Sequence, residues 1–195
     1  MKKELPDEWK RYLDHIKPMF DVIAHKRVLE IGTGDGTFWP MMREHNPASI
    51  TGLDPDTRWK IDNWDPEARE NTIRKDMFDY LPRGGYDVIV AFGIIYKFHS
   101  PIHFLELVAR SGPQYFLLEQ IVAHREHVNA HKQETNGARG TWLTESPITW
   151  VVHLPVEITT DVMQELGYEL KRKSTLESTI PGKKHTCQML FEKVN

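Results

Sequence analysis

The chain has 195 residues, and its 25 Lys and Arg side chains against 28 Asp and Glu give a formal net charge of −3 at pH 7. We expect one domain over residues 1–195, because a chain of this length buries a full core without a metal or a disulfide. The charge balance gives no sign of a polyanion partner, and the single Cys187 excludes an internal disulfide and a cysteine-rich zinc cluster. The first residues lack the apolar core of a signal peptide and no apolar run reaches the length of a membrane span, so a soluble cytoplasmic protein is expected.

Residues 1–26 are expected to form a lead-in helix. Trp9, Leu13 and Ile16 have helical spacing, and Pro18 interrupts the pattern before a second short apolar turn. A helix that covers one edge of a sheet and a lid over a bound cofactor are both compatible with this pattern.

The segment RVLEIGTGDGTF, residues 27–38, combines a strand, a glycine turn and a helix start. Val28, Leu29 and Ile31 make the apolar run of a strand that is covered on both faces. The glycines then supply a tight turn without Cβ atoms, and Asp35 or Thr37 is expected to cap the following helix. Such a turn presents backbone N–H groups at a helix N-terminus, which suits a phosphate or a carboxylate of a nucleotide cofactor.

Glu30 separates the two cofactor classes that use such a turn. Its carboxylate would repel the pyrophosphate of a dinucleotide. The spacing G-x-G-x-G, with Thr37 in place of a third glycine or alanine, also departs from the dinucleotide fingerprint G-x-G-x-x-G. A cofactor with a cationic centre therefore fits better.

Four motifs of this chain, in the same order along the sequence, resemble those of the class I S-adenosylmethionine (SAM) dependent methyltransferases. The acidic and glycine pattern at residues 30–36 is similar to the first motif of that family, and SITGLD at residues 49–54 ends in Asp54, at the position that binds the ribose hydroxyls there. TIRKDMFD at residues 72–79 resembles the third strand with its adenine-binding turn, and GYDVIVAFGIIYKF at residues 85–98 resembles the fourth strand with the loop beside the methyl group. The resemblance implies a Rossmann-like, doubly wound α/β fold whose mostly parallel seven-stranded sheet carries an antiparallel C-terminal hairpin.

The resemblance also implies SAM as the cofactor. The expected cofactor-binding residues are Glu30, Gly32, Thr33, Gly34, Gly36, Asp54, Asp76, Met77 and Phe92. The expected activity is transfer of a methyl group to an oxygen or nitrogen of a small-molecule acceptor. Because a hydroxyl or a protonated amine must lose a proton, a nearby side chain should accept it, and the candidates are His99, His124, Tyr96 and Glu119.

The middle of the chain continues the alternation of helices and strands. Residues 55–71 are polar and should contain a helix, and Pro101 is expected at the first position of another helix that ends at Gly112. The apolar run YFLLEQIV, residues 115–122, predicts the fifth strand, whose last polar residues fall at the carboxyl edge of the sheet.

The C-terminal part predicts a helix and a strand pair. Thr160 or Asp161 is the expected cap of the helix, and Gly167 its C-terminal stop. Residues 168–175 and 185–194 have the pattern of paired strands, which the family resemblance places at the sheet edge.

Residues 123–155 interrupt the alternation with a long polar insertion. We expect this insertion to build the acceptor pocket, because it follows the fifth strand at the carboxyl edge and because Trp142 and Trp150 offer flat apolar walls. A cap that only stabilises the fold is the alternative.

Three histidines of the insertion, His124, His127 and His131, would share one face if the segment were helical. A metal site is one interpretation of this spacing. Solvated side chains are the favoured one, because paired carboxylates are missing nearby, and no metal is expected.

Two other functions stay open. The loop GIIYKFHSPIHFL, residues 93–105, also resembles that of enzymes that modify the wobble uridine of transfer RNA with a SAM derivative, so an RNA acceptor is the second hypothesis. A SAM-binding protein without transferase activity, acting as a partner subunit or sensor, is the third. The sequence leaves the oligomeric state open.

Overall fold

The computed structural model describes residues 7–55, 65–81, 84–98, 100–122, 129–134, 148–176 and 185–194. Strands in these ranges form one seven-stranded sheet with the order β3-β2-β1-β4-β5-β9-β8. Its parallel strands are β1 (Arg27–Ile31), β2 (Ser49–Leu53), β3 (Thr72–Ile73), β4 (Val88–Ala91) and β5 (Tyr115–Ile121). At the other edge β9 (Thr186–Lys193) runs antiparallel to both of its neighbours, β5 and β8 (Tyr168–Leu176). A separate antiparallel pair joins β6 (Asn129–Glu134) to β7 (Ile148–His153).

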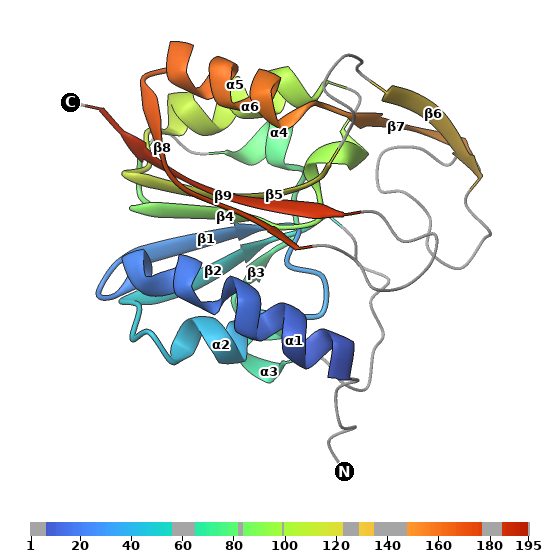
Figure 1. Cartoon of the computed structure of the whole chain (residues 1–195). Helices are drawn as coiled ribbons and strands as arrows, with labels where there is room; N and C mark the ends of the chain where they lie inside the picture. The colour runs from blue at the N-terminus through green and yellow to red at the C-terminus, as the bar shows by residue number, and fades with distance from the viewer. Residues whose placement is uncertain are drawn as a thin grey trace.

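Helices cover both faces of the sheet (Figure 1). One layer holds α1 (Asp7–Ile16), the 3-10 helix η1 (Lys17–Ile23), α2 (Trp39–Arg43) and α3 (Pro66–Glu70). The opposite layer holds α4 (Met77–Tyr80), α5 (Pro101–Ser111) and α6 (Val156–Glu165), and a short 3-10 helix η2 (Ile95–Lys97) follows β4. Within the described ranges, each helix is too short or too polar to cross a bilayer.

Side-chain alternation along β1 shows why the sheet needs two helical layers. Leu29 and Ile31 are buried with residues of α4, α5 and α6, whereas Val28 is buried with residues of η1 and α2. Because successive side chains of a strand point to opposite faces, Glu30 lies on the same face as Val28. The strand is therefore covered on both faces, as its apolar run predicts.

The fold class expected from the sequence is confirmed by this strand order and by the antiparallel hairpin. The expected lead-in helix is α1 followed by η1, with Pro18 in the first turn of η1. Helix α5 begins at Pro101 after the Ser100 cap and ends at Gly112, whose φ of 75° is left-handed. Both predicted ends of α5 are therefore confirmed.

The predicted cap of the helix after the glycine turn is wrong. Helix α2 begins at Trp39 with Phe38 at its N-cap, and no side chain caps it. The Asp35 carboxylate instead accepts the backbone N–H of Thr37, and also its hydroxyl, inside the preceding turn. Asp35 therefore shapes the turn, and the helix starts later than the capping pattern indicated.

The predicted cap of α6 is also wrong, because this helix begins at Val156 and so contains Thr160 and Asp161. Pro155 precedes it with φ of −56° and ψ of 144°, an extended conformation from which a helix can start without a side-chain cap. The predicted stop is confirmed, since the helix ends just before Gly167, whose φ is 85°.

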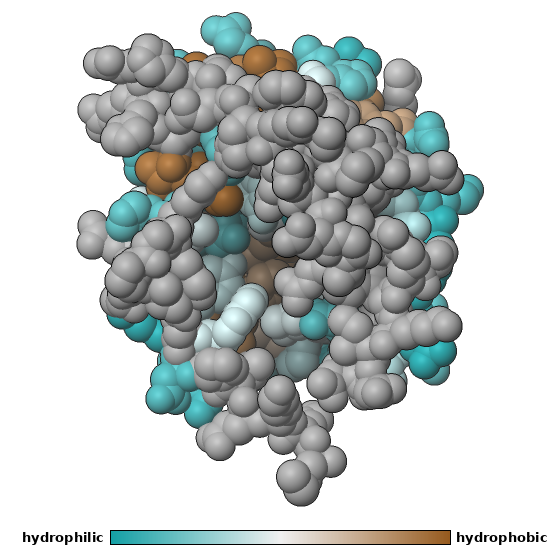
Figure 2. Space-filling view, turned by 90° about the vertical axis from the view of Figure 1, so that its right-hand side faces the viewer, coloured by the Kyte–Doolittle hydropathy of each residue, from teal (hydrophilic) through white to brown (hydrophobic). Residues whose placement is uncertain are grey.

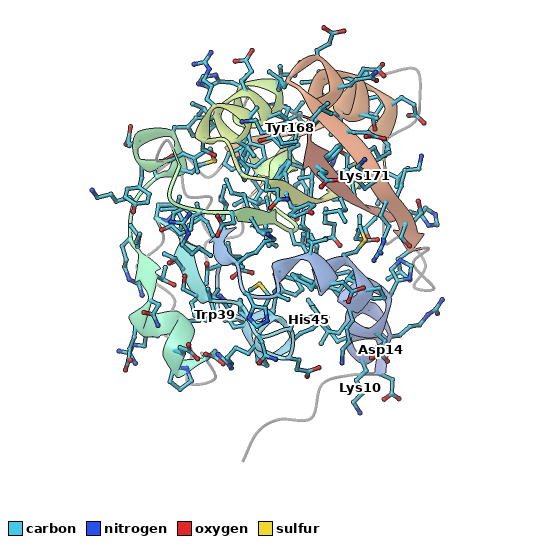
Figure 3. The ribbon with its side chains drawn as sticks, turned by 90° about the vertical axis from the view of Figure 1, so that its left-hand side faces the viewer. Lys10, Asp14, Trp39, His45, Tyr168 and Lys171 are labelled. Atoms are coloured by element: carbon cyan, nitrogen blue, oxygen red, sulfur yellow. The ribbon has the colours of Figure 1, made fainter. Side chains whose placement is uncertain are left out.

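A hydrogen bond from Tyr168 joins the C-terminal hairpin to the segment that follows α5. Its Oη donates to the carbonyl oxygen of Pro113 at 2.9 Å, and both residues are buried. Burial raises the pKa of Tyr168 to about 12, so the hydroxyl remains a donor at neutral pH. Figure 3 shows Tyr168 and Trp39 on opposite sides of the sheet, in line with the two separate core clusters to which they belong.

Removing this hydroxyl should destabilise the fold. Tyr168→Phe leaves the buried carbonyl of Pro113 without its donor, which we expect to cost about 1–3 kcal/mol of unfolding free energy in urea titrations. Tyr115→Phe is the control, because its hydroxyl contacts side chains that are not buried, Gln114 at 3.3 Å and Glu192, and it should change stability by less than about 0.5 kcal/mol. Equal effects of the two substitutions would show that the Tyr168 bond does not hold the hairpin.

Candidate active site

The candidate active site lies where the carboxyl ends of the parallel strands meet, the edge at which open α/β sheets bind ligands. The glycine turn follows β1, Asp54 follows β2, η2 comes shortly after β4, and Glu119 lies near the end of β5. Figure 2 views this side of the molecule from outside, with hydrophobic and weakly polar residues at the centre of the view. The topology thus brings the glycine turn, Asp54, the loop that carries Tyr96, and Glu119 to one edge.

The glycine turn has one open position between two packed ones. Gly32, Gly34 and Gly36 have φ values of 78°, 55° and 73°, which other residues rarely adopt. A Cβ on Gly32 would clash with the side chain of Ile94, and one on Gly36 would lie 2.5 Å from the Cβ of Ala68. At Gly34 the nearest atom is the Gly32 oxygen at 3.9 Å. The outer glycines therefore permit close packing, and Gly34 leaves the backbone open to a ligand.

Asp54 joins the end of β2 to this turn. Its carboxylate is 1% exposed, and its Oδ2 accepts the backbone N–H of Gly34 at 2.8 Å. The backbone N–H of Gly32 also donates to the carbonyl oxygen of Leu53 at 2.8 Å. Because a carboxylate has several lone pairs, Asp54 can accept hydroxyl donors in addition to this bond.

Glu30 supports the turn from behind. It is 2% exposed, and its Oε2 accepts the indole N–H of Trp39 at 2.7 Å. Burial raises the pKa of Glu30 to about 8, although hydrogen bonds from Trp39 and Thr33 act in the opposite direction. The raised pKa weakens the charge repulsion expected between Glu30 and a pyrophosphate, so the glycine spacing is the stronger argument against a dinucleotide. Thr33 is buried too, and its hydroxyl donates to the Glu30 carbonyl oxygen at 3.1 Å.

Asp76 and Met77 lie at the start of α4, next to β3. The Asp76 Oδ1 accepts the backbone N–H of Phe78 at 2.8 Å and so caps the helix. The Met77 side chain is 4% exposed and belongs to the core. A contact from Met77 to a cofactor would therefore use its backbone, as the family resemblance implies.

Phe92 belongs to an aromatic row between η1 and the glycine turn. Its ring centroid lies 5.6 Å from that of Phe20 and 5.5 Å from that of Phe38. Phe38 lies 6.2 Å from the ring of Tyr12 on α1. The row connects the N-terminal helix to the loop after β4.

Glu119 is held by two neutral donors. The Tyr12 hydroxyl donates to its Oε2 at 2.5 Å, and the Gln188 amide donates to the same oxygen at 2.8 Å. Gln188 stands directly opposite Glu119 in the register of β5 and β9, so both side chains lie on the face covered by α1. Glu119 is 7% exposed. The N-terminal helix, far away in the sequence, therefore reaches into the candidate site.

Gly93 marks the point where Glu119 and Tyr96 approach each other. From the position that a Cβ would take at Gly93, the Glu119 Oε1 and the Tyr96 hydroxyl are each 3.9 Å away. The Tyr96 ring also lies 5.6 Å from the ring of His153, the last residue of β7. Two of the predicted proton acceptors are thus brought together beside the loop that follows β4.

The pKa values of Glu119, Tyr12 and Tyr96 are all raised. Burial raises the pKa of Glu119, against the effect of the hydrogen bonds from Tyr12 and Gln188. Burial also raises the pKa of Tyr12 and of Tyr96, and the charge of Glu119 adds to both shifts. The tyrosines are therefore protonated donors at neutral pH, and Glu119 takes up a proton more readily than an exposed glutamate does.

Gln120 points away from this group, into the other helical layer. Its amide donates to the carbonyl oxygen of Leu154 at 2.9 Å, and its oxygen accepts the Thr159 hydroxyl at 2.7 Å. These bonds tie β5 to the start of α6, so Gln120 has a structural role.

His99, His124 and His127 lie outside the described residues, as do Trp142 and the rest of residues 135–147, and the side chains of His131 and Trp150 are not described. In the ranges that the structure describes, no three His, Cys, Asp or Glu side chains gather as a metal site. The roles predicted for His99 and His124 stay predictions.

Sequence reasoning missed Tyr12, Gln188, His153 and Trp39. Tyr12 follows Trp9 by three residues and so shares its helix face, which was a usable signal. Gln188 could be found only from the register of β9 against β5, because nothing in the local sequence marks it.

Comparison with known proteins agrees with this geometry. A family model described as "Methyltransferase domain" matches residues 1–170. The tRNA U34 carboxymethyltransferase of Campylobacter jejuni is 31% identical over 110 residues, which cover 51% of this chain and 36% of that protein. The protein of the same name from Nautilia profundicola is 32% identical over 117 residues, covering 54% and 38%. The chain thus matches little more than a third of the length of these curated relatives.

Solved structures of similar fold cover nearly the whole chain. The Burkholderia thailandensis 1,6-didemethyltoxoflavin-N1-methyltransferase, solved with S-adenosylhomocysteine, has a TM-score of 0.69 at 11% identity and covers 97% of this chain and 83% of its own. The Synechocystis magnesium protoporphyrin IX methyltransferase, solved with SAM, has a TM-score of 0.64 at 10% identity and covers 95% and 79%. The expectations of a Rossmann-like fold and, at the level of the family, of a SAM-dependent methyltransferase are confirmed. The chain belongs to the methyltransferase domain family.

Proposed function

We propose that this chain transfers a methyl group from SAM to an oxygen or nitrogen of a small-molecule acceptor, and that residues 1–195 act as one SAM-binding domain. The observation that carries the proposal is the placement of Glu119 and Tyr96 beside Gly93, at the same sheet edge as the glycine turn and Asp54. A cofactor on the turn and an acceptor near Glu119 would be neighbours, as an in-line transfer requires.

The cofactor contacts that we propose follow the geometry of the edge. Asp54 accepts the ribose hydroxyls, the open backbone at Gly34 lies against the amino acid part, and Asp76 with the Met77 backbone borders the adenine. Phe92 closes the site toward α1. The fit rests on an observation of this structure, because at Gly34 a ligand can approach where a Cβ would otherwise stand.

The remaining members of the glycine motif hold the turn in place. Gly32 and Gly36 allow it to pack against Ile94 and Ala68, and Thr33 and Glu30 are buried beneath it. We propose that these residues act on cofactor affinity through the shape of the turn.

The chemistry that we propose needs little from the protein besides alignment and the exclusion of water. SAM supplies a methyl group on a positively charged sulfur, which is already activated for displacement. Tyr12 and Gln188 fix Glu119 through its Oε2, so its Oε1 faces the space beside Gly93. This oxygen is the proposed acceptor of the proton that the substrate loses. Tyr96, 3.9 Å from the same point, would orient the substrate.

An RNA acceptor is the second candidate, because the curated relatives are named tRNA U34 carboxymethyltransferases. The match covers about half of this chain, and the formal charge of −3 offers no excess of cations for a phosphate backbone. A small molecule is therefore our first choice.

Replacing Asp54 should weaken SAM binding while the protein stays folded. Asp54→Asn retains an oxygen for the Gly34 N–H but removes the charge that would bind the ribose, so we expect a loss of about 1–3 kcal/mol in SAM binding by calorimetry. NAD should not bind to either protein. Unchanged SAM affinity in the folded variant would rule out Asp54 as the ribose ligand.

Glu30→Gln should flatten the dependence of stability on pH. The folded-state pKa of about 8 lies above the ordinary value of 4.5, so the proton bound by Glu30 stabilises the fold below pH 4.5, and this contribution is lost as pH rises through 8. Wild type should lose on the order of 3 kcal/mol between pH 5 and 8.5 from this group, whereas the neutral glutamine should not. Urea unfolding at several pH values tests this. Parallel curves for the two proteins would show that Glu30 does not titrate in this range.

Methyl incorporation tests the function itself. Purified protein is given SAM with a labelled methyl group, together with either the small-molecule fraction or the bulk transfer RNA of source cells. We expect label in the small-molecule fraction only. Label in transfer RNA alone would favour the second candidate, and SAM binding without any labelled product would favour a non-catalytic SAM-binding protein.

A further inference from the structure

The hydrogen bonds at Glu119 leave the site with acceptors and few donors. Tyr12 and Gln188 both donate to the same carboxylate oxygen, Oε2, at 2.5 and 2.8 Å. The other oxygen, Oε1, lies 3.9 Å from the Cβ position of Gly93. A ligand that fills this space must therefore bring donors of its own.

Gln188 adds a second acceptor without a donor to the side chains around Glu119. Its side chain is fully buried, and its amide nitrogen is used by Glu119 and by the Thr186 hydroxyl at 2.9 Å. Its Oε1 is buried without a hydrogen-bond partner among the described residues. A buried acceptor without a donor costs about 1–3 kcal/mol, so this group of side chains is short of donors.

The charge at Glu119 is also uncompensated. In the part of the chain that the structure describes, both of its hydrogen-bond donors are neutral, and no Lys or Arg forms an ion pair with it. A buried carboxylate without a cation is costly, and a cationic ligand would remove that cost.

We infer that the acceptor is a small-molecule amine, which binds as an ammonium group to the Glu119 Oε1 in the space beside Gly93. This inference rests on the proposed methyl transfer and names the substrate class for it. An ammonium group brings several donors and no acceptor, which matches a site with open acceptors. A neutral hydroxyl would bring one donor and would leave the charge of Glu119 uncompensated.

The same oxygen completes the reaction. The ammonium proton passes to the Glu119 Oε1, which frees the nitrogen lone pair. The lone pair forms the new N–C bond to the methyl group while the S–C bond breaks, and its electron pair stays on sulfur in S-adenosylhomocysteine. The product is a methylated ammonium ion, and Glu119 returns its proton to solvent when the product leaves. Burial of Glu119, which raises its pKa, favours the first of these steps.

The position of the transferred methyl group tests the inference. Protein and methyl-labelled SAM are incubated with a small-molecule extract of source cells, products are separated on a cation exchanger, and tandem mass spectrometry locates the label. We expect the label on nitrogen in a cationic product. Label on oxygen overturns the amine and leaves methyl transfer standing, whereas no labelled product despite SAM binding in calorimetry overturns both.

Variants of Glu119 test the mechanism with the amine so identified. Glu119→Gln should lower kcat/KM at least about 100-fold, the usual loss of a proton-accepting group, while SAM affinity stays within about threefold, under roughly 0.7 kcal/mol. Glu165→Gln, at the exposed end of α6, is the matched control and should keep full turnover. Full turnover of Glu119→Gln overturns the inference.

Tyr96→Phe covers the case in which Glu119→Gln fails to fold. It leaves the carboxylate and its two donors in place and removes only the hydroxyl that faces Gly93. We expect KM for the amine to rise about tenfold, or roughly 1.4 kcal/mol, with SAM affinity unchanged. An unchanged KM for the amine would contradict its placement beside Gly93.

Discussion

The hydrogen bond from the Gly34 N–H to the Asp54 carboxylate is the contact on which the cofactor site depends. It joins the loop after β1 to the end of β2 across 20 residues of sequence, and it fixes the turn at Gly34, the glycine of the turn that has room for a ligand. Gly32 and Gly36 hold left-handed conformations because they have no Cβ, and for the same reason Ile94 and Ala68 can pack where a side chain would stand. The strand order then places this turn next to the loop after β4, where Gly93 lies.

The acceptor side depends on the alternation of side chains along β5. Glu119 points to the face covered by α1, and Gln120 points to the face covered by α6, so one residue is available for chemistry and the next for structure. Helix α1 is anchored by the buried Ile16 and by η1, and its Tyr12 reaches Glu119. Helix α1 thus packs on the sheet and also borders the proposed acceptor site, and its role as a lid over the cofactor stays a prediction.

Local patterns predicted the elements and the edge at which they meet. The apolar runs, Pro101 and the glycine motif are local signals, so the sequence alone located the strands of the seven-stranded sheet, α5 and the turn. It did not predict the pair of β6 and β7 inside the insertion. The caps of α2 and α6 were wrong because Asp35 bonds within the turn and because Pro155 starts a helix without a side-chain cap.

Contacts between distant segments could not be predicted in the same way. Tyr12 and Gln188 come to Glu119 from the two ends of the chain, and only the packing of α1 and the register of β9 bring them together. The raised pKa of Glu30 was missed for a similar reason, since it follows from burial of the side chain and not from the motif around it.

A crystal structure of the protein with SAM would test the central claim most directly. The account predicts that the ribose hydroxyls donate to Asp54, that the cofactor crosses the turn at Gly34, and that the methyl group points toward Gly93 and the Glu119 Oε1. A methyl group directed away from Glu119, or a ribose bound elsewhere than at Asp54, would contradict it.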